Sequence, residues 1–339
     1  MLGGAMSQFA LGINGTPACP ASDNALTFKI TLNESGDIED TEIIPSIINV
    51  TRLSYEEADR LIEETETVAS LTPAAKTTPF ILGELCRLAE ANLERRLSAG
   101  AVHISLPEIH LSVAEHTVQI LPIVHHRSAA LVRECMLLAG EAAAAWAARR
   151  RIPFPYITQE TGDLPAKPLP GLAGNIQLRR CMRPRSVSAK PGCHWGLGLD
   201  SYSQVTSPLR RYTDLLAHQQ IYACLCKETG KSDTMEPLNE EEVLYRLAAG
   251  DAAAQAVTQA ERASKAHWTA VYLDELLCAG TAPLWDAVVT EKRANGLGII
   301  IPALGLETQI GGSGNLNDEM KVRFKSVKIP EPEFIFIKA

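Results

Sequence analysis

CHWGLGLDSYSQVTSPLRRYTDLLAH, residues 193–218, is the stretch that decides how the rest of the chain is interpreted. Its second half predicts a helix over Pro208–Cys226, because a Thr-Ser-Pro start suits an N-cap followed by proline and apolar side chains then repeat at helical spacing. We therefore expect Arg210 and Arg211 in the first turn of that helix.

Two adjacent arginines at a helix start are an electrostatic conflict. Backbone N–H groups are unpaired in the first turn and the helix dipole is positive there, so further positive charge is unfavourable. An anion bound at that end would relieve the conflict. Phosphate is the obvious candidate, because guanidinium groups and helix N-termini both bind it well.

The charge of the chain is unevenly distributed. The formal net charge is −8, from 32 basic and 40 acidic side chains, which argues against a general polyanion-binding protein. Between Arg149 and Arg211, however, eleven Lys or Arg side chains face three acids. This segment is interpreted either as a solvated loop with scattered arginines or as a surface that binds an anion.

The cysteines and the apolar stretches limit the cellular location of the protein to more than one possible compartment. Eight cysteines occur without a CxxC pair, which favours reduced thiols. No Lys or Arg precedes Lys29, so a secretory signal is not indicated, and the apolar stretch Met136–Ala148 is too short to span a bilayer. We expect no membrane association, and a bacterial-type cytoplasm or an organelle stroma as the location.

The first half of the chain predicts one hairpin followed by helices. Strands Leu26–Leu32 and Ile43–Val50 form the hairpin, with acidic residues at a solvated tip. Ser54 and Glu57 form a capping box for a helix to about Glu64. Further helices are predicted over Pro79–Ser98, Ser128–Arg150 and Asn239–Cys278. The opening residues lack any start signal, so we interpret the chain as a fragment whose first Met need not be the true start.

The remaining segments predict loops and then a small barrel. Arg151–Trp195 is rich in proline and predicts loops laid across a surface. Short strands are predicted over Trp285–Glu291, Leu297–Ile301, Glu307–Ile310, Met320–Lys328 and Phe334–Lys338. In Met320–Lys328, apolar residues alternate with Lys and Arg, which indicates one buried face and one basic, solvated face.

The sequence GLGLDSYSQVTSPLRRYTDLLAH closely resembles the signature of the ribonuclease II and ribonuclease R (RNB) family. That signature is a Gly-Leu-Gly-Leu run, a tyrosine, then Thr-Ser-Pro-hydrophobic-Arg-Arg/Lys-Tyr, with an Asp and a His further on. The resemblance extends back through LTFKITLNESGDIEDTEIIPSIINVTRLSYEEAD and forward through AERASKAHW, and so covers most of residues 1–280.

The resemblance implies an α+β fold in two domains. Residues 1–279 would form an RNB-type catalytic domain, a mixed sheet with surrounding helices, without its N-terminal Asp-rich segment. Residues 280–339 look like the RNA-binding OB-fold barrel that commonly ends such proteins. Members of the family degrade single-stranded RNA processively from its 3′ end, releasing nucleoside monophosphates by magnesium-dependent hydrolysis. We expect single-stranded RNA as the partner of a monomeric chain.

The resemblance also implies roles for individual residues. Arg210 matches the catalytic arginine that contacts the scissile phosphate, and Arg211 would support phosphate binding. Glu261, in AERA, resembles the glutamate that helps to organise the site. The implied RNA-binding residues are Tyr55 in LSYEEAD, which would stack on a base near the 3′ end, Tyr202 and Tyr212 of the signature, and Ile104. Tyr55 as an ordinary packed residue and Glu261 as a solvated helix acid remain alternatives.

Two positions depart from the family pattern. Ile104, in AVHISLPE, stands where the family often has a phenylalanine, and a branched aliphatic side chain cannot stack on a base as an aromatic does. At Arg133-Glu134 the more usual Glu-Glu pair reads Arg-Glu, which puts the ribose contact of the first acid in doubt.

The sequence holds no aspartate cluster for a metal. Mg²⁺ prefers several hard oxygen ligands, yet the closest pair, Asp37 and Asp40, matches no metal motif. We therefore expect the Mg²⁺ ligands of the intact enzyme to lie upstream of this chain, and the chain alone to be inactive. The pairs His125-His126 and Cys193-His194 lack a second pair at zinc spacing, so no metal ligand is assigned.

Two alternatives to an exoribonuclease stay open. The first is a non-catalytic RNA-binding or regulatory protein that keeps the RNA channel without the metal site. The second is a structural subunit whose arginines bind an acidic protein partner.

Overall fold

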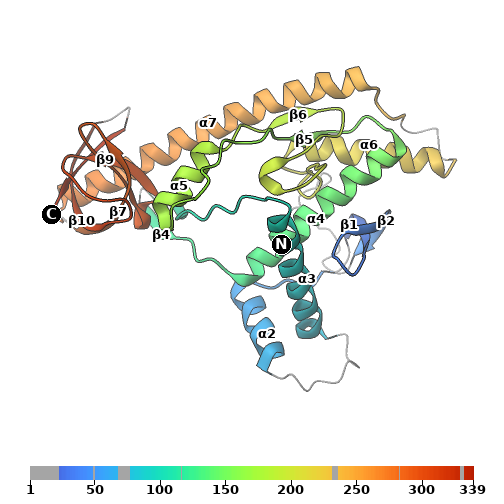
Figure 1. Cartoon of the computed structure of the whole chain (residues 1–339), viewed down its shortest axis with the longest axis horizontal. Coiled ribbons are helices and arrows are strands. Elements are labelled where there is room, and N and C mark those ends of the chain that lie inside the picture. The colour runs from blue at the N-terminus through green and yellow to red at the C-terminus, as the bar shows by residue number, and fades with distance from the viewer. Residues whose placement is uncertain are drawn as a thin grey trace. The chain divides into compact units, whose positions relative to one another are not determined.

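The structure, a computed structural model, divides into two compact units (Figure 1). It describes residues 23–48, 50–67, 77–115, 117–230, 236–281, 283–328 and 332–339. Unit 1 takes its described residues from 1–102, 125–161 and 183–253, and unit 2 from 103–124, 162–182 and 254–339. The boundary predicted between residues 279 and 280 stays a prediction.

Unit 1 is mainly helical. Its helices are α2 (Tyr55–Thr67), α3 (Thr78–Ser98), α4 (Arg127–Arg150), α6 (Tyr212–Glu228) and the first part of α7 (Glu240–Cys278). Its strands form two antiparallel pairs, β1 (Asp23–Leu32) with β2 (Ile38–Ile48) and β5 (Tyr156–Thr158) with β6 (Ser186–Ser188). A short 3₁₀ helix, η2 (Trp195–Leu197), follows β6.

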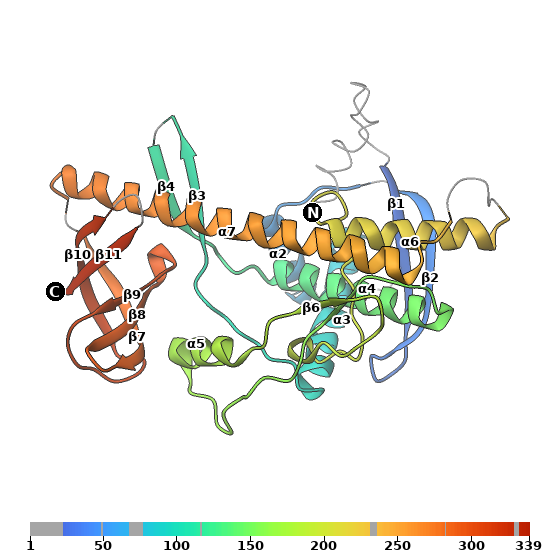
Figure 2. The same cartoon turned by 90° about the horizontal axis from the view of Figure 1, so that it is seen from above.

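Unit 2 contains the rest of α7, a hairpin, a short helix and a barrel. The hairpin pairs β3 (Ile109–Ala114) with β4 (Thr117–Pro122), and the helix is α5 (Gly171–Cys181), as Figure 2 shows. The barrel strands are β7 (Leu284–Arg293), β8 (Gly296–Ile301), β9 (Leu306–Ile310), β10 (Glu319–Lys328) and β11 (Glu333–Lys338), with the 3₁₀ helix η3 (Pro302–Leu304) before β9.

The predicted N-terminal hairpin is confirmed, but only part of its acidic run lies at the tip, with Glu34 and Asp37. The Oδ1 atom of Asn33 accepts hydrogen bonds from the backbone N–H groups of Ser35 at 3.0 Å and Asp37 at 2.9 Å. Gly36, with φ of 82°, supplies the left-handed residue that this tight turn needs. Because the turn closes by Asp37, the acidic run that follows lies on β2 and not at the tip.

The predicted helices form, and two of them begin with a capping box. Ser54 and Glu57 each bond the other's backbone N–H group, at 2.7 and 3.1 Å, and α2 begins directly after Ser54. Asn239 and Glu242 repeat this exchange, with both bonds at 2.9 Å, where α7 begins. Reciprocal capping explains why these two starts could be read from the sequence.

The predicted start of α6 is wrong by four residues. Pro208 opens a turn instead, in which the backbone N–H groups of Arg210 and Arg211 donate to the carbonyl of Ser207 at 3.2 and 3.0 Å. Arg211 is the N-cap, with an extended backbone at φ −123° and ψ 119°, and α6 begins at Tyr212. The two arginines therefore precede the helix, and the expected conflict with its first turn does not arise.

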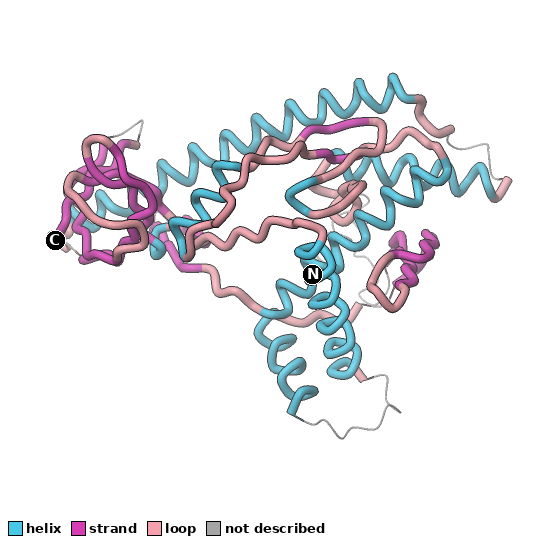
Figure 3. The backbone as a smooth tube through the Cα atoms, viewed as in Figure 1, coloured by secondary structure: helices cyan, strands magenta, loops and turns pink. Residues whose placement is uncertain are grey.

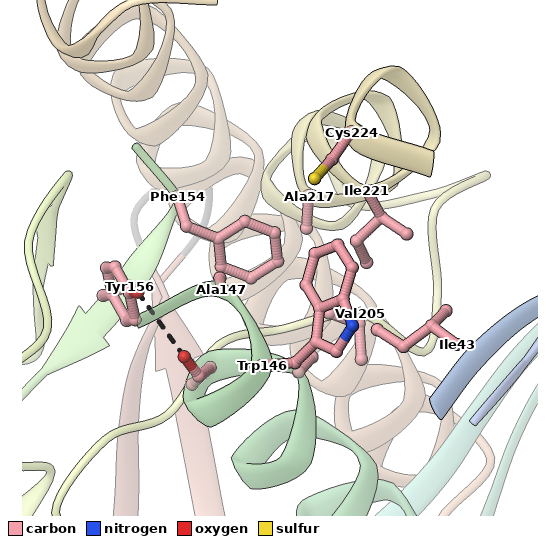
Figure 4. Close-up of a cluster of buried hydrophobic side chains, with 11 residues drawn as sticks. Ile43, Trp146, Ala147, Phe154, Tyr156, Val205, Ala217, Ile221 and Cys224 are labelled. Atoms are coloured by element: carbon pink, nitrogen blue, oxygen red, sulfur yellow. Dashed lines mark hydrogen bonds between the residues drawn. The ribbon is translucent and has the colours of Figure 1, made fainter. Parts of the chain in front are cut away.

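The core of unit 1 is built around Trp146 of α4 (Figure 4). Neighbouring alanines of α4 are fully buried and belong to the same core cluster as Ala217 and Ile221 of α6. The hydroxyl of Tyr156 donates to the carbonyl of Ala144 at 3.5 Å, and burial raises the pKa of Tyr156 to about 12. Small alanine side chains and the large ring of Trp146 thus fill the core that α4 and α6 share.

The predicted C-terminal barrel is confirmed as a near-closed, five-stranded antiparallel barrel. The strand order is β11-β10-β7-β8-β9, and the hydroxyl of Thr308 on β9 donates to the carbonyl of Phe334 on β11 at 3.2 Å, across the gap between the edge strands. On β10, Val322 and Phe324 are buried, while Lys321, Arg323 and Lys325 are exposed as predicted. The α+β fold class is therefore confirmed.

The prediction of loops throughout the proline-rich segment is wrong in part, because α5 forms where eleven residues run without a proline. Asn317, in the loop before β10, holds the start of this helix. Its Oδ1 accepts from the Ala173 N–H group at 3.0 Å, and its Nδ2 donates to the Pro170 carbonyl at 2.9 Å. Local sequence patterns cannot predict a contact between residues so far apart in the sequence.

In the described part of the chain, the strands outside the barrel form three separate antiparallel pairs, as the magenta segments of Figure 3 show. None of the described helices combines the length and apolar composition that a bilayer crossing requires.

Gly140→Ala should destabilise the protein. A Cβ atom at Gly140 would lie 2.4 Å from both the Ser203 carbonyl oxygen and Cε2 of Tyr202. Because the carbonyl is backbone, we expect the unfolding free energy to fall by about 1–3 kcal/mol in chemical denaturation. Gly311→Ala is the control, since its added Cβ meets nothing within 4 Å. A Gly140→Ala variant as stable as the parent would show that α4 can move away from Ser203.

The ion pair between α5 and β9 should give a pH-dependent contribution to stability. Arg179 donates two hydrogen bonds to Glu307, at 2.6 and 2.7 Å. These bonds lower the pKa of Glu307 and outweigh the opposing effect of burial. The contribution is therefore present above the unfolded carboxyl pKa, about 4.3, and is lost as pH falls through the lower folded value.

We expect Glu307→Gln to reduce the unfolding free energy at pH 7 by at most about 1 kcal/mol, because the pair is half exposed. The difference should vanish at acidic pH. Glu275→Gln, an exposed change on α7, is the control. A deficit that is equal at both pH values would mean that the charge of Glu307 contributes nothing.

Candidate functional site

The two arginines of the signature lie on a loop that two side chains of α6 hold. We call Val205–Arg211 the arginine loop. The carboxylate Oδ1 of Asp214 accepts the backbone N–H of Ser207 at 2.8 Å, and Nε2 of His218 donates to the carbonyl of Val205 at 2.6 Å. Asp214 and His218 are one helical turn apart, so a single face of α6 fixes the loop that precedes it.

Asp214 also binds the second arginine of the pair. Its side chain is 0% exposed, and Oδ1 accepts Nη2 of Arg211 at 2.7 Å. Nη2 of Arg211 also donates to the hydroxyl of Thr206 at 3.1 Å. A carboxylate removed from water is tolerated only when it is paired, so the guanidinium of Arg211 is committed to the protein's own interior.

Arg210 is in the opposite situation. Its side chain is exposed, and in the described part of the chain it makes no hydrogen bond or ion pair. Its neighbour in sequence is held inward, whereas the Arg210 guanidinium keeps all its donors for a ligand. The structure therefore places the two guanidinium groups differently: that of Arg211 is bound within the protein, and that of Arg210 is exposed.

His218 holds the loop as a neutral donor. Burial lowers the pKa of His218, and the hydrogen bond to Val205 and the charge of Asp214 only partly oppose this effect. The ring is therefore uncharged near neutral pH, and since a carbonyl can only accept, the proton is on Nε2.

Tyr202 lies between the arginine loop and α4. Its ring packs against Gly140 and meets the ring of His194 edge-on, with 5.7 Å between centroids. Burial raises the pKa of Tyr202, while the positive charges of Arg211 and Arg96 oppose the shift. The phenol is thus protonated and within electrostatic reach of Arg96 and Arg211.

A second buried ion pair fixes the segment that leads to Tyr202. Arg96 of α3 donates to Glu134 of α4 at 2.7–3.1 Å, and its Nη1 donates to the Leu197 carbonyl of η2 at 3.0 Å. Glu134 is only 2% exposed and also accepts Nδ2 of Asn92 at 3.1 Å. Arg133 is 49% exposed, so at the departure from the Glu-Glu pattern the acid points inward and the arginine outward.

Tyr55 is the first residue of α2 and already has an aromatic neighbour. Its ring stacks on that of His126, at 5.8 Å between centroids and 16° between planes. Nδ1 of His126 lies 2.8 Å from Oδ2 of Asp59, whose Oδ1 accepts the N–H group of Ser128 at 2.8 Å. This end of α2 therefore caps the start of α4. The arrangement supports the interpretation of Tyr55 as an ordinary packed residue, and its contact with RNA stays a prediction.

Tyr212 begins α6 and packs on α7. A Cβ atom at Gly250 would lie 2.4 Å from Cδ1 of Tyr212, so the ring rests directly on the α7 backbone. The side chain is still 42% exposed and is available to a ligand.

The other two predicted site residues belong to unit 2. Ile104 is partly buried in the segment before β3, where the N–H group of Ser105 donates to Oδ1 of Asn175 at 2.9 Å. Glu261 is exposed on α7. The structure thus brings Tyr202, Arg210, Arg211 and Tyr212 together around the start of α6, and it describes Ile104 and Glu261 with a different unit.

The basic segment 149–211 offers less free positive charge than its sequence suggests. At least six of its eleven Lys and Arg side chains form ion pairs within the protein. These are Arg150–Glu228, Arg179–Glu307, Arg180–Glu291, Arg185–Asp251, Lys190–Glu240 and Arg211–Asp214. Counting charges in a segment therefore overstates its anion-binding surface.

A metal site was not found in the described part of the chain, where no group of three His, Cys, Asp or Glu side chains could hold an ion. Asp37 lies in the hairpin turn, 3.8 Å from Arg95, and Asp40 lies on β2. The described residues therefore do not fit a magnesium site, and no metal-dependent step is assigned to them.

Sequence reasoning gave no role to Asp214 or His218, although both belong to the signature. The available signal was their spacing: an acid and a histidine four residues apart, immediately after an arginine pair, on the face of α6 that is otherwise apolar. Only the structure shows that both reach back to the same loop.

The chain thus combines an α+β fold, a C-terminal antiparallel barrel and an arginine loop before α6. These features can be compared with known protein families. The model of the RNB domain family matches residues 11–167 and 172–227, more than half of the chain. The chain belongs to the RNB domain family, as the signature predicted.

A relative from Synechocystis sp., named as an uncharacterized ribonuclease, is 35% identical over 296 residues, covering 84% of this chain and 41% of the relative. The chain spans less than half the length of the curated relatives that it matches.

Solved structures share the fold at low identity. Mycoplasma genitalium RNase R in complex with ribose-methylated single-stranded RNA gives a TM-score of 0.69 at 16% identity, covering 94% of this chain and 58% of that chain. Dss1 exoribonuclease from Candida glabrata gives 0.73 at 19%, covering 94% and 42%. Yeast Ssd1, described as a pseudonuclease, gives 0.57 at 15%, covering 91% and 42%.

Arg211→Met should destabilise the protein far more than Arg210→Met. Removing Arg211 leaves the buried Asp214 carboxylate without its charged partner, which should lower the unfolding free energy by about 3 kcal/mol. Arg210 is exposed and unpartnered among the described residues, so its loss should change stability by less than about 0.5 kcal/mol. Chemical denaturation of both variants measures the difference, and equal losses would contradict the division of roles.

Proposed function

We propose that this chain binds single-stranded RNA through Arg210 and that the intact protein is a 3′-to-5′ exoribonuclease releasing nucleoside monophosphates. One observation carries the proposal. On a loop whose other arginine, Arg211, is paired with the buried carboxylate of Asp214, the guanidinium of Arg210 is exposed and has no partner among the described residues. Family membership and relatives named as ribonucleases support RNA as the ligand.

Arg210 supplies the chemistry that this reaction needs at phosphorus. Hydrolysis of a phosphodiester builds negative charge on the non-bridging oxygens, and a guanidinium held beside them stabilises that charge with two parallel hydrogen bonds. Such stabilisation is greatest when the donor is fixed in advance. The loop that carries Arg210 is fixed by Asp214 and His218.

The tyrosines are proposed to contact the RNA bases. Tyr212 is exposed beside Arg210, so its ring could stack on a base whose phosphate the arginine binds. Tyr202 and Tyr55 are more enclosed and would contribute a ring edge or a single face. Ile104 offers apolar contact without stacking, and Glu261 is proposed to help to organise the site.

Magnesium dependence belongs to the proposal for the intact enzyme. Bound Mg²⁺ would activate the attacking water and neutralise charge on the phosphate. The described residues of this chain do not form its ligand group, so their proposed part is to hold the RNA and its scissile phosphate.

A non-catalytic RNA-binding protein is the second candidate. It is favoured by the lack of a metal-binding group among the described residues, and the pseudonuclease Ssd1 has a similar fold. Incubation of the intact protein with 5′-labelled single-stranded RNA separates the two, with Mg²⁺ or with a chelator, because this chain alone is expected to be inactive in either case. Shortening of the RNA from its 3′ end that requires Mg²⁺ supports the nuclease. RNA binding without shortening supports the second candidate, and the absence of binding overturns both.

Arg210→Ala should weaken RNA binding uniformly across RNA sequences, because a phosphate contact carries no base information. Measured by fluorescence anisotropy at several salt concentrations, the slope of log affinity against log salt should become shallower by about 0.7. Arg149→Ala, at the exposed end of α4, is the matched control and should leave the slope unchanged. An unaltered slope in Arg210→Ala would exclude a phosphate contact.

A further inference from the structure

We propose that Asp214 and His218 are positioning residues that hold Arg210 in place for the RNA phosphate. This inference rests on the proposed function of Arg210. Neither side chain needs to touch RNA, because both act through the backbone of the arginine loop.

The loop is held at its entry, middle and exit. His218 donates to the carbonyl of Val205 at 2.6 Å, and Asp214 accepts the N–H group of Ser207 at 2.8 Å and the guanidinium of Arg211 at 2.7 Å. Arg210 lies between the second and third of these points, and its own N–H group donates to the Ser207 carbonyl at 3.2 Å. Its backbone is therefore fixed on both sides while its side chain remains exposed.

The helix that carries both residues is itself fixed. Leu216, Ala217 and Ile221 of α6 are buried in the core. Gln220, also fully buried, donates from Nε2 to the carbonyls of Pro153 at 2.8 Å and Leu238 at 3.1 Å. A loop attached to such a helix inherits its rigidity, which is the condition for placing a charged group accurately.

The chemistry of the two contacts explains the residue types. Asp214 must accept from a backbone N–H group and also balance the charge of Arg211, and only a carboxylate does both. His218 must donate to a carbonyl without bringing a positive charge into the interior. Burial lowers the pKa of His218, and the neutral ring with its proton on Nε2 meets that need.

A purely structural role is the competing explanation, because any buried polar side chain needs partners. The two accounts differ in how they couple to Arg210. If Asp214 and His218 act through Arg210, their loss matters for RNA only while Arg210 is present. If they merely stabilise the fold, their loss weakens RNA binding equally whether or not Arg210 is present.

The test is a double-mutant cycle on the full chain, with affinity for a labelled single-stranded RNA measured below the melting temperature of every variant. His218→Ala and Asp214→Asn are made in the parent and in Arg210→Ala. We expect each to lower affinity about tenfold in the parent and to have no further effect in Arg210→Ala. An equal fold-loss in both backgrounds overturns the inference.

Two more variants make the outcome specific. His218→Gln places an amide donor within reach of the Val205 carbonyl and should restore most of the affinity lost in His218→Ala. Glu134→Gln alters the other buried arginine–carboxylate pair and should lower the melting temperature without coupling to Arg210. If Asp214→Asn does not fold, the His218 variants decide alone.

The pattern of results separates this inference from the proposed function. Arg210→Ala that weakens RNA binding, together with His218→Ala and Asp214→Asn that bind like the parent, overturns the positioning role and leaves the proposed function intact. Arg210→Ala that binds RNA like the parent overturns both.

Discussion

A carboxylate that is buried away from water needs charged or hydrogen-bonding partners inside the protein. Unit 1 contains two such carboxylates, Glu134 and Asp214. Glu134 is bound by Arg96 and Asn92, which ties α3 to α4 and, through the carbonyl of Leu197, to η2. Asp214 is bound by Arg211 and a backbone N–H group, which ties α6 to the arginine loop. Removing either partner would strand a buried charge, so both connections are obligatory rather than incidental.

The need of a buried carboxylate for a partner also explains why the two adjacent arginines differ. Arg211 neutralises the buried carboxylate of Asp214. The side chain of Arg210 is exposed and has no partner among the described residues. The pairing of most charges in the basic segment follows the same logic, since at least six of its cations already have acids beside them. The number of cations in this segment therefore overstates the positive charge that its internal ion pairs leave available.

Membership of the RNB domain family places this site in a fold that does not by itself determine catalysis. Structures described as an exoribonuclease and as a pseudonuclease both resemble the chain, at identities of 19% and 15%. Function depends on the site and not on the fold, and the described residues include no group that could hold a metal ion. The arginine loop is thus a part that a nuclease and an RNA-binding protein could both use.

Patterns that repeat locally were enough to predict much of the fold. The capping box at Ser54 and Glu57 and the alternation on β10 depend on neighbours a few residues apart, and both appear in the structure as predicted. The signature likewise led to the family. The start of α6 and the helix α5 were beyond reach, because they depend on Asp214 binding back to Ser207 and on Asn317 binding to Ala173. Sequence alone pointed to the arginine pair as a candidate for phosphate binding. Tertiary structure decided which of the two has no partner among the described residues, Arg210, because the buried carboxylate of Asp214 binds Arg211.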